Sequence, residues 1–149
     1  MGFMDTLAIS ASGMTAERLR MDVVANNLAN VNTTRTPGGG PFRRQDVVLT
    51  PQGTSFAQTL TSFADGGDTG AVSGGVQVQG IVPDNTPFKR VYEPGHPDAD
   101  KQGYVSMPNV DTVTEMVDMM GATRAYEANV AAVAAVKGMA MKALSIGQA

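Results

Sequence analysis

The 149-residue sequence contains no cysteine, no tryptophan and one histidine, and only 5% of its residues are aromatic. Without cysteine the chain has no disulfide scaffold, no zinc–thiolate site, no iron–sulfur cluster and no cysteine nucleophile. The aromatic content is low for a protein with one compact core. With 11 basic and 14 acidic side chains, the net charge of −3 provides no general attraction to nucleic acid or anionic lipid. We therefore expect no nucleic-acid partner.

Proline is absent from the two ends of the chain. All eight prolines lie between Pro37 and Pro108, together with twelve of the 17 glycines, whereas nine of the ten methionines lie outside this stretch. Because proline and glycine disfavour helices, the ends are suited to helix and the middle is not. We predict that residues 1–32 and 109–149 form paired terminal helices in one domain, and that residues 33–108 form a β-rich middle module. No secretory signal or transmembrane helix is readable, so we expect no direct membrane insertion.

The N-terminal segment carries apolar residues at every seventh position between about residues 5 and 31. Such a narrow stripe predicts a helix with a coiled-coil-like seam. The stripe consists of Leu7, Met14, Met21 and Leu28.

Four asparagines lie close together at the end of this segment. Asparagine competes for backbone hydrogen bonds and therefore favours helix ends. Asn30 or Asn32 could cap the helix in the left-handed conformation. Asn26, Asn27 and Asn30 could instead hydrogen-bond to a partner helix and fix its register. A frayed polar helix end is the third interpretation, and the sequence alone leaves all three open.

The C-terminal segment begins after Pro108, where Asn109 or Asp111 can cap a helix. We predict a helix from residue 111 to about residue 145. Its apolar positions again step by three and four, and Lys137 alone interrupts them. This second stripe consists of Met116, Met119, Thr123, Tyr126, Val130, Val133, Ala140 and Leu144.

The two helices are expected to pair with each other as an antiparallel, coiled-coil-like hairpin. The predicted fold class is therefore mainly α with a small β module, in which a glycine- and proline-rich, β-containing insertion joins the helices. Methionine makes their seams adaptable. The second helix has more apolar surface than one partner can cover, which indicates contacts with other subunits. A self-sufficient helical hairpin is the alternative.

The middle of the chain contains four candidate strands. Residues 42–50 have strand composition, and residues 76–82 alternate between apolar and polar side chains as a half-buried strand does. Residues 88–93 and 103–107 are weaker candidates. Between the first two, residues 54–75 are rich in Gly, Ser, Thr and Asp, which predicts a flexible loop.

No residue pattern predicts catalysis. The single histidine, His96, is followed by Asp98 and Asp100 and preceded by Glu93, but two prolines and a glycine make this segment a turn-rich loop rather than a metal site. The glycines at 38–40 precede a strand and lack the residues of a phosphate-binding loop. We expect no catalytic, metal-binding or cofactor-binding residues, and no enzyme.

Three motifs carry a resemblance to a known family. Residues 25–33 (ANNLANVNT) are similar to the N-terminal signature of flagellar axial proteins, a group that includes rod, hook and hook-associated proteins. Residues 115–120 (EMVDMM) followed by 124–129 (RAYEAN) resemble their C-terminal signature. Within the group, residues 91–100 (VYEPGHPDAD) together with 103–105 and 107–110 resemble the proximal-rod proteins of the FlgC type. Asp111 departs from the asparagine expected there.

The resemblance implies a structural subunit of the bacterial flagellar basal body. In that family the terminal helices pair into an inner tube around the export channel, and the middle forms an outer β-rich module. The subunits assemble helically as part of the drive shaft, in the rod that spans the periplasm. The implied partners are copies of the same chain, neighbouring rod proteins of the FlgB and FlgF types, a basal-body adaptor of the FliE type and the flagellar type III export apparatus.

Combined with the stripes, this resemblance predicts which residues meet neighbouring subunits. Lys137 is expected to meet a carboxylate or a carbonyl there, and the helical ends are expected to become fully ordered on docking. The alternatives are a monomeric binding domain or enzyme that uses the central loops, and a rod protein of the FlgB type. The expected interface residues are Leu7, Met14, Met21, Asn27, Leu28, Asn30, Met116, Met119, Tyr126, Val130, Val133, Lys137 and Leu144.

Overall fold

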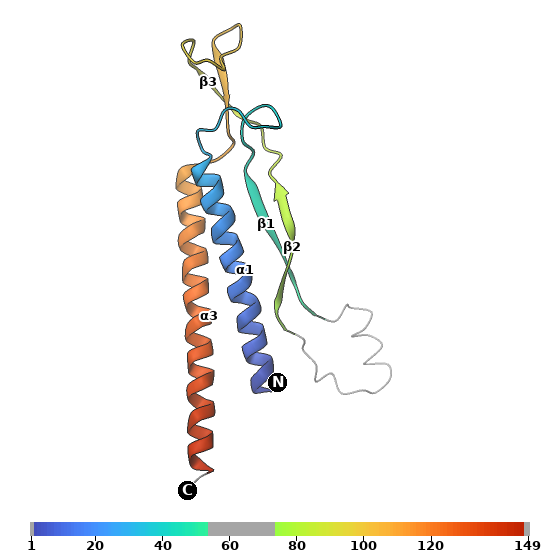
Figure 1. The fold of residues 1–149 in the computed structure, drawn as a ribbon, viewed down its shortest axis with the longest axis vertical. Coiled ribbons are helices and arrows are strands. Elements are labelled where there is room, and N and C mark those ends of the chain that lie inside the picture. The colour runs from blue at the N-terminus through green and yellow to red at the C-terminus, as the bar shows by residue number, and fades with distance from the viewer. Residues whose placement is uncertain (1, 54–73, 148–149) are drawn as a thin grey trace, which may run out of the picture. The chain divides into compact units, whose positions relative to one another are not determined.

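The computed structural model describes residues 2–53 and 74–147. Within them the chain forms two long helices and four short strands (Figure 1). The predicted helices are confirmed to within about two residues at each end, and the four predicted strands are present. The predicted flexible loop lies outside the described residues except for Gly74 and Gly75. The elements are α1 (Phe3–Ala29), β1 (Gln45–Pro51), β2 (Val76–Pro83), β3 (Lys89–Tyr92), β4 (Tyr104–Met107) and α3 (Thr112–Ile146).

Hydrogen bonds between two of its own asparagines stabilise the C-terminal end of helix α1. The Asn30 side-chain amide donates to the carbonyl oxygen of Asn26 at 2.9 Å and to the Asn26 side-chain oxygen at 2.7 Å. No described residue other than glycine has a positive φ, so the predicted left-handed cap at Asn30 or Asn32 is wrong. Because the Asn30 amide already satisfies a free carbonyl at the helix end, the chain leaves the helix without the left-handed turn.

Helix α3 begins with an aspartate cap. The Asp111 carboxylate accepts a hydrogen bond from the Val113 backbone N–H at 3.0 Å, and its carbonyl accepts one from Glu115 at 2.9 Å. The prediction of Asp111 as a cap is thereby confirmed. Asn109 has a different role. Its side chain accepts from the Arg44 backbone N–H at 2.8 Å and donates to the Thr86 hydroxyl at 2.8 Å.

In the described part of the chain, the strands form two sheets of two strands each. The β1–β2 pair is antiparallel, because Asp84 N–H donates to the Arg44 carbonyl next to one end, and Gln52 N–H donates to the Gly75 carbonyl next to the other. Strand β1 starts three residues later than predicted. Just before it, the backbone N–H groups donate elsewhere, that of Phe42 to the Thr33 carbonyl and that of Arg44 to Asn109.

The β3–β4 pair is antiparallel, with Val91 opposite Val105 and Tyr92 opposite Tyr104. Val105 is almost fully buried, whereas the two tyrosines are exposed and pack edge to face with ring centroids 5.3 Å apart. On the face of Val105, only β4 is buried, because all four residues of β3, Val91 among them, are exposed.

The chain divides into two compact units. The first consists of Met1–Arg18, Leu49–Gln79 and Thr123–Ala149, and the second of Leu19–Val48 and Gly80–Ala122. Each unit thus combines helix segments with strand segments. Among the residues that the structure describes, Ala16 and Val136 are the buried apolar residues of the first unit; those of the second include Val23, Val24, Val105, Val110 and Ala122.

In the first unit, the Ser12 hydroxyl joins α1 to the start of β2. It accepts a hydrogen bond from the Val76 backbone N–H at 3.1 Å and donates to the Ile9 carbonyl at 2.7 Å. In the second unit, Asp100 closes the turn between β3 and β4. Hydrogen bonds from the backbone N–H groups of Tyr104 and Gln102, with the charge of Arg90, hold the pKa of Asp100 below its ordinary value.

Gly103 is required at the base of β4. Its φ is +82°, and an added Cβ would lie 2.9 Å from a Tyr92 ring carbon and 3.2 Å from the Pro94 Cβ. We predict that Gly103→Ala lowers the free energy of unfolding by about 1–2 kcal/mol, because it forces a left-handed alanine into a filled space. Urea unfolding followed by circular dichroism measures the change.

The matched control is Gly121→Ala in α3. An added Cβ at Gly121 meets open space, so this variant is expected to raise the free energy of unfolding by up to about 1 kcal/mol through helix propensity. Equal effects of the two substitutions would contradict the assigned role of Gly103.

Candidate functional site

The predicted stripe on α1, which takes every seventh residue, lies beside the most buried side of the helix. Leu7, Met14, Met21 and Leu28 are half-buried. The fully buried side is formed by Ser10, Ala16, Val23, Val24 and Asn27, several of which are small or polar. Large apolar residues therefore mark the edge of the packed face of α1, and its centre consists of residues that the stripe does not include.

On α3 the predicted stripe divides into two groups. Met119, Tyr126 and Val133 are half-buried, and Asn129, also half-buried, faces Gly13 of α1. The other predicted interface residues, Met116, Val130, Lys137 and Leu144, are exposed and thus available to partners.

The buried side of α3 contains a residue that the sequence analysis did not select. Buried or half-buried positions step by three and four through Glu115, Met119, Ala122, Tyr126 and Asn129. Glu115 is fully buried but was passed over because it is charged. Extending the spacing backwards from Ala122 through Met119 would have reached it.

Asn27 connects three elements of the second unit. Its amide N–H₂ donates to the Gln45 carbonyl at 2.8 Å and to Glu115 Oε2 at 3.0 Å, and its side-chain oxygen accepts from the Gln45 N–H at 3.0 Å. The interpretation of the asparagines as links to a partner helix is confirmed for Asn27. Asn26 and Asn30 bond to each other instead.

Arg44 neutralises the buried carboxylate. Its Nε donates to Glu115 Oε1 at 2.6 Å, and its Nη2 lies 3.3 Å from Asp118 Oδ2. Asp46 and Asp84 lie farther from the guanidinium, at 3.8 and 4.0 Å. Partial burial alone lowers the pKa of Arg44, but the hydrogen bond to Glu115 and the surrounding carboxylates outweigh it and raise the pKa above its ordinary value.

We call these residues, Asn27, Arg44 and Glu115, the buried polar cluster. Both carboxylate oxygens of Glu115 have a donor, one from Arg44 and one from Asn27. The cluster ties the end of α1 and the start of α3 to the start of β1. A buried ion pair of this kind adds little net stability compared with apolar packing, but losing one partner leaves an uncompensated buried charge. The cluster therefore fixes which segments meet.

The side chains of the turn-rich loop that could take part in catalysis, those of His96, Asp98 and Asp100, already accept hydrogen bonds from neighbouring residues. His96 Nδ1 accepts from the Asp98 backbone N–H at 3.1 Å. Asp98 accepts from the Thr34 hydroxyl at 2.8 Å, and Asp100 accepts from Arg90. Both carboxylates line an open pocket of about 370 Å³. Within residues 2–53 and 74–147, no group of three or more histidine, aspartate or glutamate side chains is placed to hold a metal ion.

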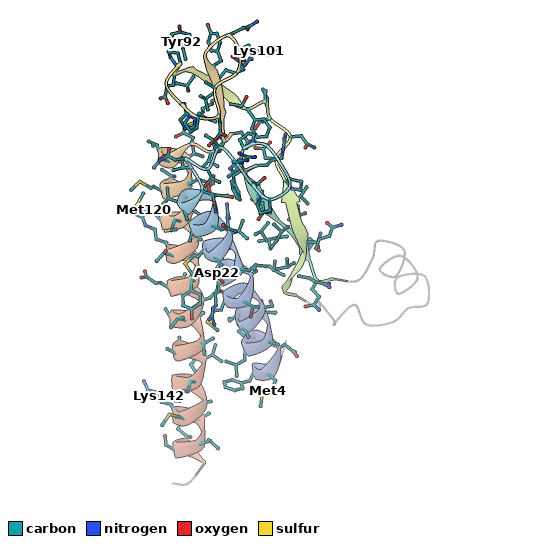
Figure 2. The ribbon with its side chains drawn as sticks, turned by 45° about the horizontal axis from the view of Figure 1, so that its top comes forward. Met4, Asp22, Tyr92, Lys101, Met120 and Lys142 are labelled. Atoms are coloured by element: carbon teal, nitrogen blue, oxygen red, sulfur yellow. The ribbon has the colours of Figure 1, made fainter. Side chains whose placement is uncertain are left out.

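Helix α3 presents a large apolar surface to solvent. Figure 2 shows Met120 projecting outward from α3, and the side chain is more than half exposed. Among the described residues, α3 is the one helix that is long and apolar enough, by length and composition only, to cross a membrane, and 6% of its most apolar stretch is buried. The sequence analysis did not detect this because charged residues such as Glu127 and Lys137 interrupt the apolar run. A surface of this size indicates a partner.

Comparison with known proteins gives matches at both ends of the chain. A model described as "Flagella basal body rod protein" matches residues 7–35, and one described as "Flagellar basal body rod FlgEFG protein C-terminal" matches residues 101–146. These segments contain Asn27 and Glu115, the two helix residues of the buried polar cluster.

Full-length relatives share one name, "Flagellar basal-body rod protein FlgC". The protein from Bacillus subtilis (strain 168) is 49% identical over 147 residues, covering 96% of this chain and 97% of the relative. The protein from Borreliella burgdorferi is 45% identical, with 99% of each chain covered. The protein from Salmonella typhimurium is 39% identical over 99% of this chain and 100% of its own.

We predict that Glu115→Gln lowers the free energy of unfolding by about 3 kcal/mol, because Arg44 loses its closest counter-charge in a buried place. Replacing both partners, as in Arg44→Met with Glu115→Met, is expected to cost less than the sum of the two single substitutions. The double-mutant cycle consists of the unaltered chain, Arg44→Met, Glu115→Met and the double variant, each unfolded in urea.

Glu127→Gln is the control for this cycle, since Glu127 is exposed on the same helix. It should change stability by less than about 0.5 kcal/mol. Additive effects of the Arg44 and Glu115 substitutions would show that the pair is not coupled.

Proposed function

This chain belongs to the flagellar basal-body rod proteins of the FlgC type, and from this membership we propose how its helices build the rod. It is a structural subunit of the flagellar basal body, and the relatives are rod proteins, not enzymes. This reading is favoured over a monomeric binding domain or enzyme and over a rod protein of the FlgB type. We propose the finer role of a proximal-rod subunit that assembles helically around the export channel as part of the drive shaft.

We propose that α1 and α3 pair as an antiparallel, coiled-coil-like hairpin that forms the inner-tube domain, residues 1–32 and 109–149. Two contacts support this arrangement. Asn27 meets Glu115 in the second unit, and Gly13 faces Asn129 in the first. Residue numbers fall along α1 as they rise along α3, as antiparallel pairing requires. Residues 33–108 then form the outer β-rich module.

The observation that carries the proposal is the exposed apolar side of α3. A helix that meets α1 on one side and leaves Met116, Val130 and Leu144 in solvent has an unsatisfied hydrophobic surface. Contacts between different surfaces of successive subunits produce open helical arrays rather than closed dimers. We propose that neighbouring subunits cover these residues together with Lys137, and that the half-buried Leu7, Met14, Met21, Leu28, Asn30, Met119, Tyr126 and Val133 and the fully buried Asn27 support the same tube.

We propose the following partners: copies of this chain, rod proteins of the FlgB and FlgF types, a FliE-type adaptor and the flagellar type III export apparatus. The proposed location is the rod where it spans the periplasm. Protein rather than lipid then covers α3, without direct membrane insertion. Charged side chains that interrupt its apolar surface, among them Arg124, Glu127 and Lys137, support this choice because charges are costly in a bilayer.

We predict that Val130→Glu abolishes rod assembly, because it places an unpaired carboxylate in an apolar contact between subunits. Incorporation into isolated basal bodies should fall by at least about tenfold, and swimming should be lost. The purified chain should keep its helix content, since Val130 is 43% exposed.

Val82→Glu is the matched control, an exposed valine of β2 with 48% of its surface in solvent. It should assemble normally. If both variants assemble normally, or if both fail equally, the assignment of the α3 surface is wrong.

Lys137 is expected to pair with a carboxylate or a carbonyl of a neighbouring subunit. Lys137→Gln should therefore weaken assembly, while Lys142→Gln, an exposed lysine five residues later, serves as the control. Motility and basal-body yield in strains carrying each variant measure the difference. Normal assembly of Lys137→Gln would argue against the pairing.

A further inference from the structure

The chain carries its sulfur in methionine alone. It contains ten methionines, no cysteine and no tryptophan. Oxidation of sulfur in proteins follows the nucleophilic character and the exposure of the group, and cysteine thiolates react before methionine thioethers. A peroxide that meets this chain finds no thiol to consume it. The exposure of each thioether therefore decides where oxidation begins.

Two exposed methionines belong to the second unit and lie near the start of α3. Every residue of this unit, 19–48 and 80–122, is described. Met116 is 52% exposed and Met120 is 53% exposed. Since they are four residues apart, they lie on the same side of the helix. Figure 2 shows Met120 projecting outward from α3, so its thioether is open to a dissolved oxidant.

Two valines complete this exposed side of α3. Val113 and Val117 are both more than half exposed, and each precedes a methionine by three residues. Side chains at this spacing are neighbours on a helix surface. We call the four residues Val113, Met116, Val117 and Met120 the methionine patch. None of its side chains carries a charge or a hydrogen-bond donor, so the two thioethers lie in an apolar surface.

The same unit also contains methionines that are less accessible. Met119 is adjacent to Met120 in the sequence but is half-buried, and Met107 of β4 is half-buried as well. One chemical group thus occurs in two environments within a short stretch of chain. An oxidant present in a limiting amount should distinguish them by access.

We propose that Met116 and Met120 form a reversible oxidation site of the free chain, and that their oxidation blocks entry into the rod. Hydrogen peroxide transfers one oxygen atom to each thioether, which becomes a sulfoxide, and the peroxide is reduced to water. A methionine sulfoxide reductase reverses the step: two thiols become a disulfide, the oxygen leaves as water, and the thioether is restored. A sulfoxide is polar, so the methionine patch loses the apolar surface that a neighbouring subunit would cover. This last step rests on the proposed function.

Limited oxidation of the free, full-length chain by hydrogen peroxide tests the site. Trypsin gives one peptide, residues 102–124, that contains Met107, Met116, Met119 and Met120. Fragment-ion mass spectrometry therefore compares all four thioethers within one peptide. The two exposed methionines should oxidise at least about fivefold faster than the two half-buried ones. Equal rates would overturn the proposal.

The same chain unfolded in urea is the control for intrinsic reactivity. Without the fold, all four thioethers are open to solvent, so their oxidation rates should become equal. A preference for Met116 and Met120 that persisted in urea would mean that local sequence and not exposure selects them, and the structural assignment would be wrong.

Two double variants test the effect on assembly. Met116→Gln with Met120→Gln makes the methionine patch polar without an oxidant, and incorporation into isolated basal bodies should fall by about tenfold. Met116→Leu with Met120→Leu keeps the patch apolar and removes both thioethers, so it should assemble normally. In cells without methionine sulfoxide reductase, peroxide should lower incorporation of the unaltered chain much more than that of the leucine variant. Both variants should keep their helix content, because the replaced side chains are exposed.

Normal assembly of the glutamine variant would overturn the proposal, and so would equal peroxide sensitivity of the unaltered chain and the leucine variant. Val130→Glu distinguishes this result from a failure of the proposed function. If Val130→Glu blocks assembly while the glutamine variant assembles, only the oxidation site is wrong. If both assemble, the exposed surface of α3 is not a contact between subunits.

Discussion

The buried carboxylate of Glu115 is the constraint on which the second unit depends. A fully buried charge requires a counter-charge and hydrogen-bond donors, and α3 alone provides neither to it. Arg44 comes from the residues just before β1, and Asn27 comes from the end of α1. The charge therefore selects one arrangement of three segments that are distant in the sequence. Alternative pairings of the same helices would leave it unpaired.

This requirement also gives a physical meaning to the terminal signatures. The asparagine-rich motif of residues 25–33 contains Asn27, and the motif of residues 115–120 contains Glu115 and Asp118. One side chain of the first motif bonds directly to one of the second at 3.0 Å. The amide of Asn27 also pairs with both backbone groups of Gln45, which no shorter or apolar side chain could do.

Helix α3 has two different surfaces. The side with Glu115, Ala122 and Val136 is buried within the chain, while Met116, Met120 and Val130 remain in solvent. Exposed apolar area of this extent is costly for a monomer and useful for a subunit, because the same area stabilises the assembly when neighbours cover it. The low aromatic content has the same explanation, because much of the apolar surface of α3 faces solvent and stabilises the assembly rather than the core of the single chain.

The sequence by itself determined the elements. Proline-free ends with three- and four-residue spacing specify helices, Asp111 specifies the start of α3, and alternation specifies β2, because each depends on neighbours in the chain. Motif order also indicated the family. Only the tertiary structure decided which asparagine bonds to the partner helix, and that Glu115 and not an apolar residue begins the buried side of α3. These outcomes depend on partners that lie 71–88 residues away in the chain, such as Glu115 for Arg44 and Asn27, and local spacing carries no information about them.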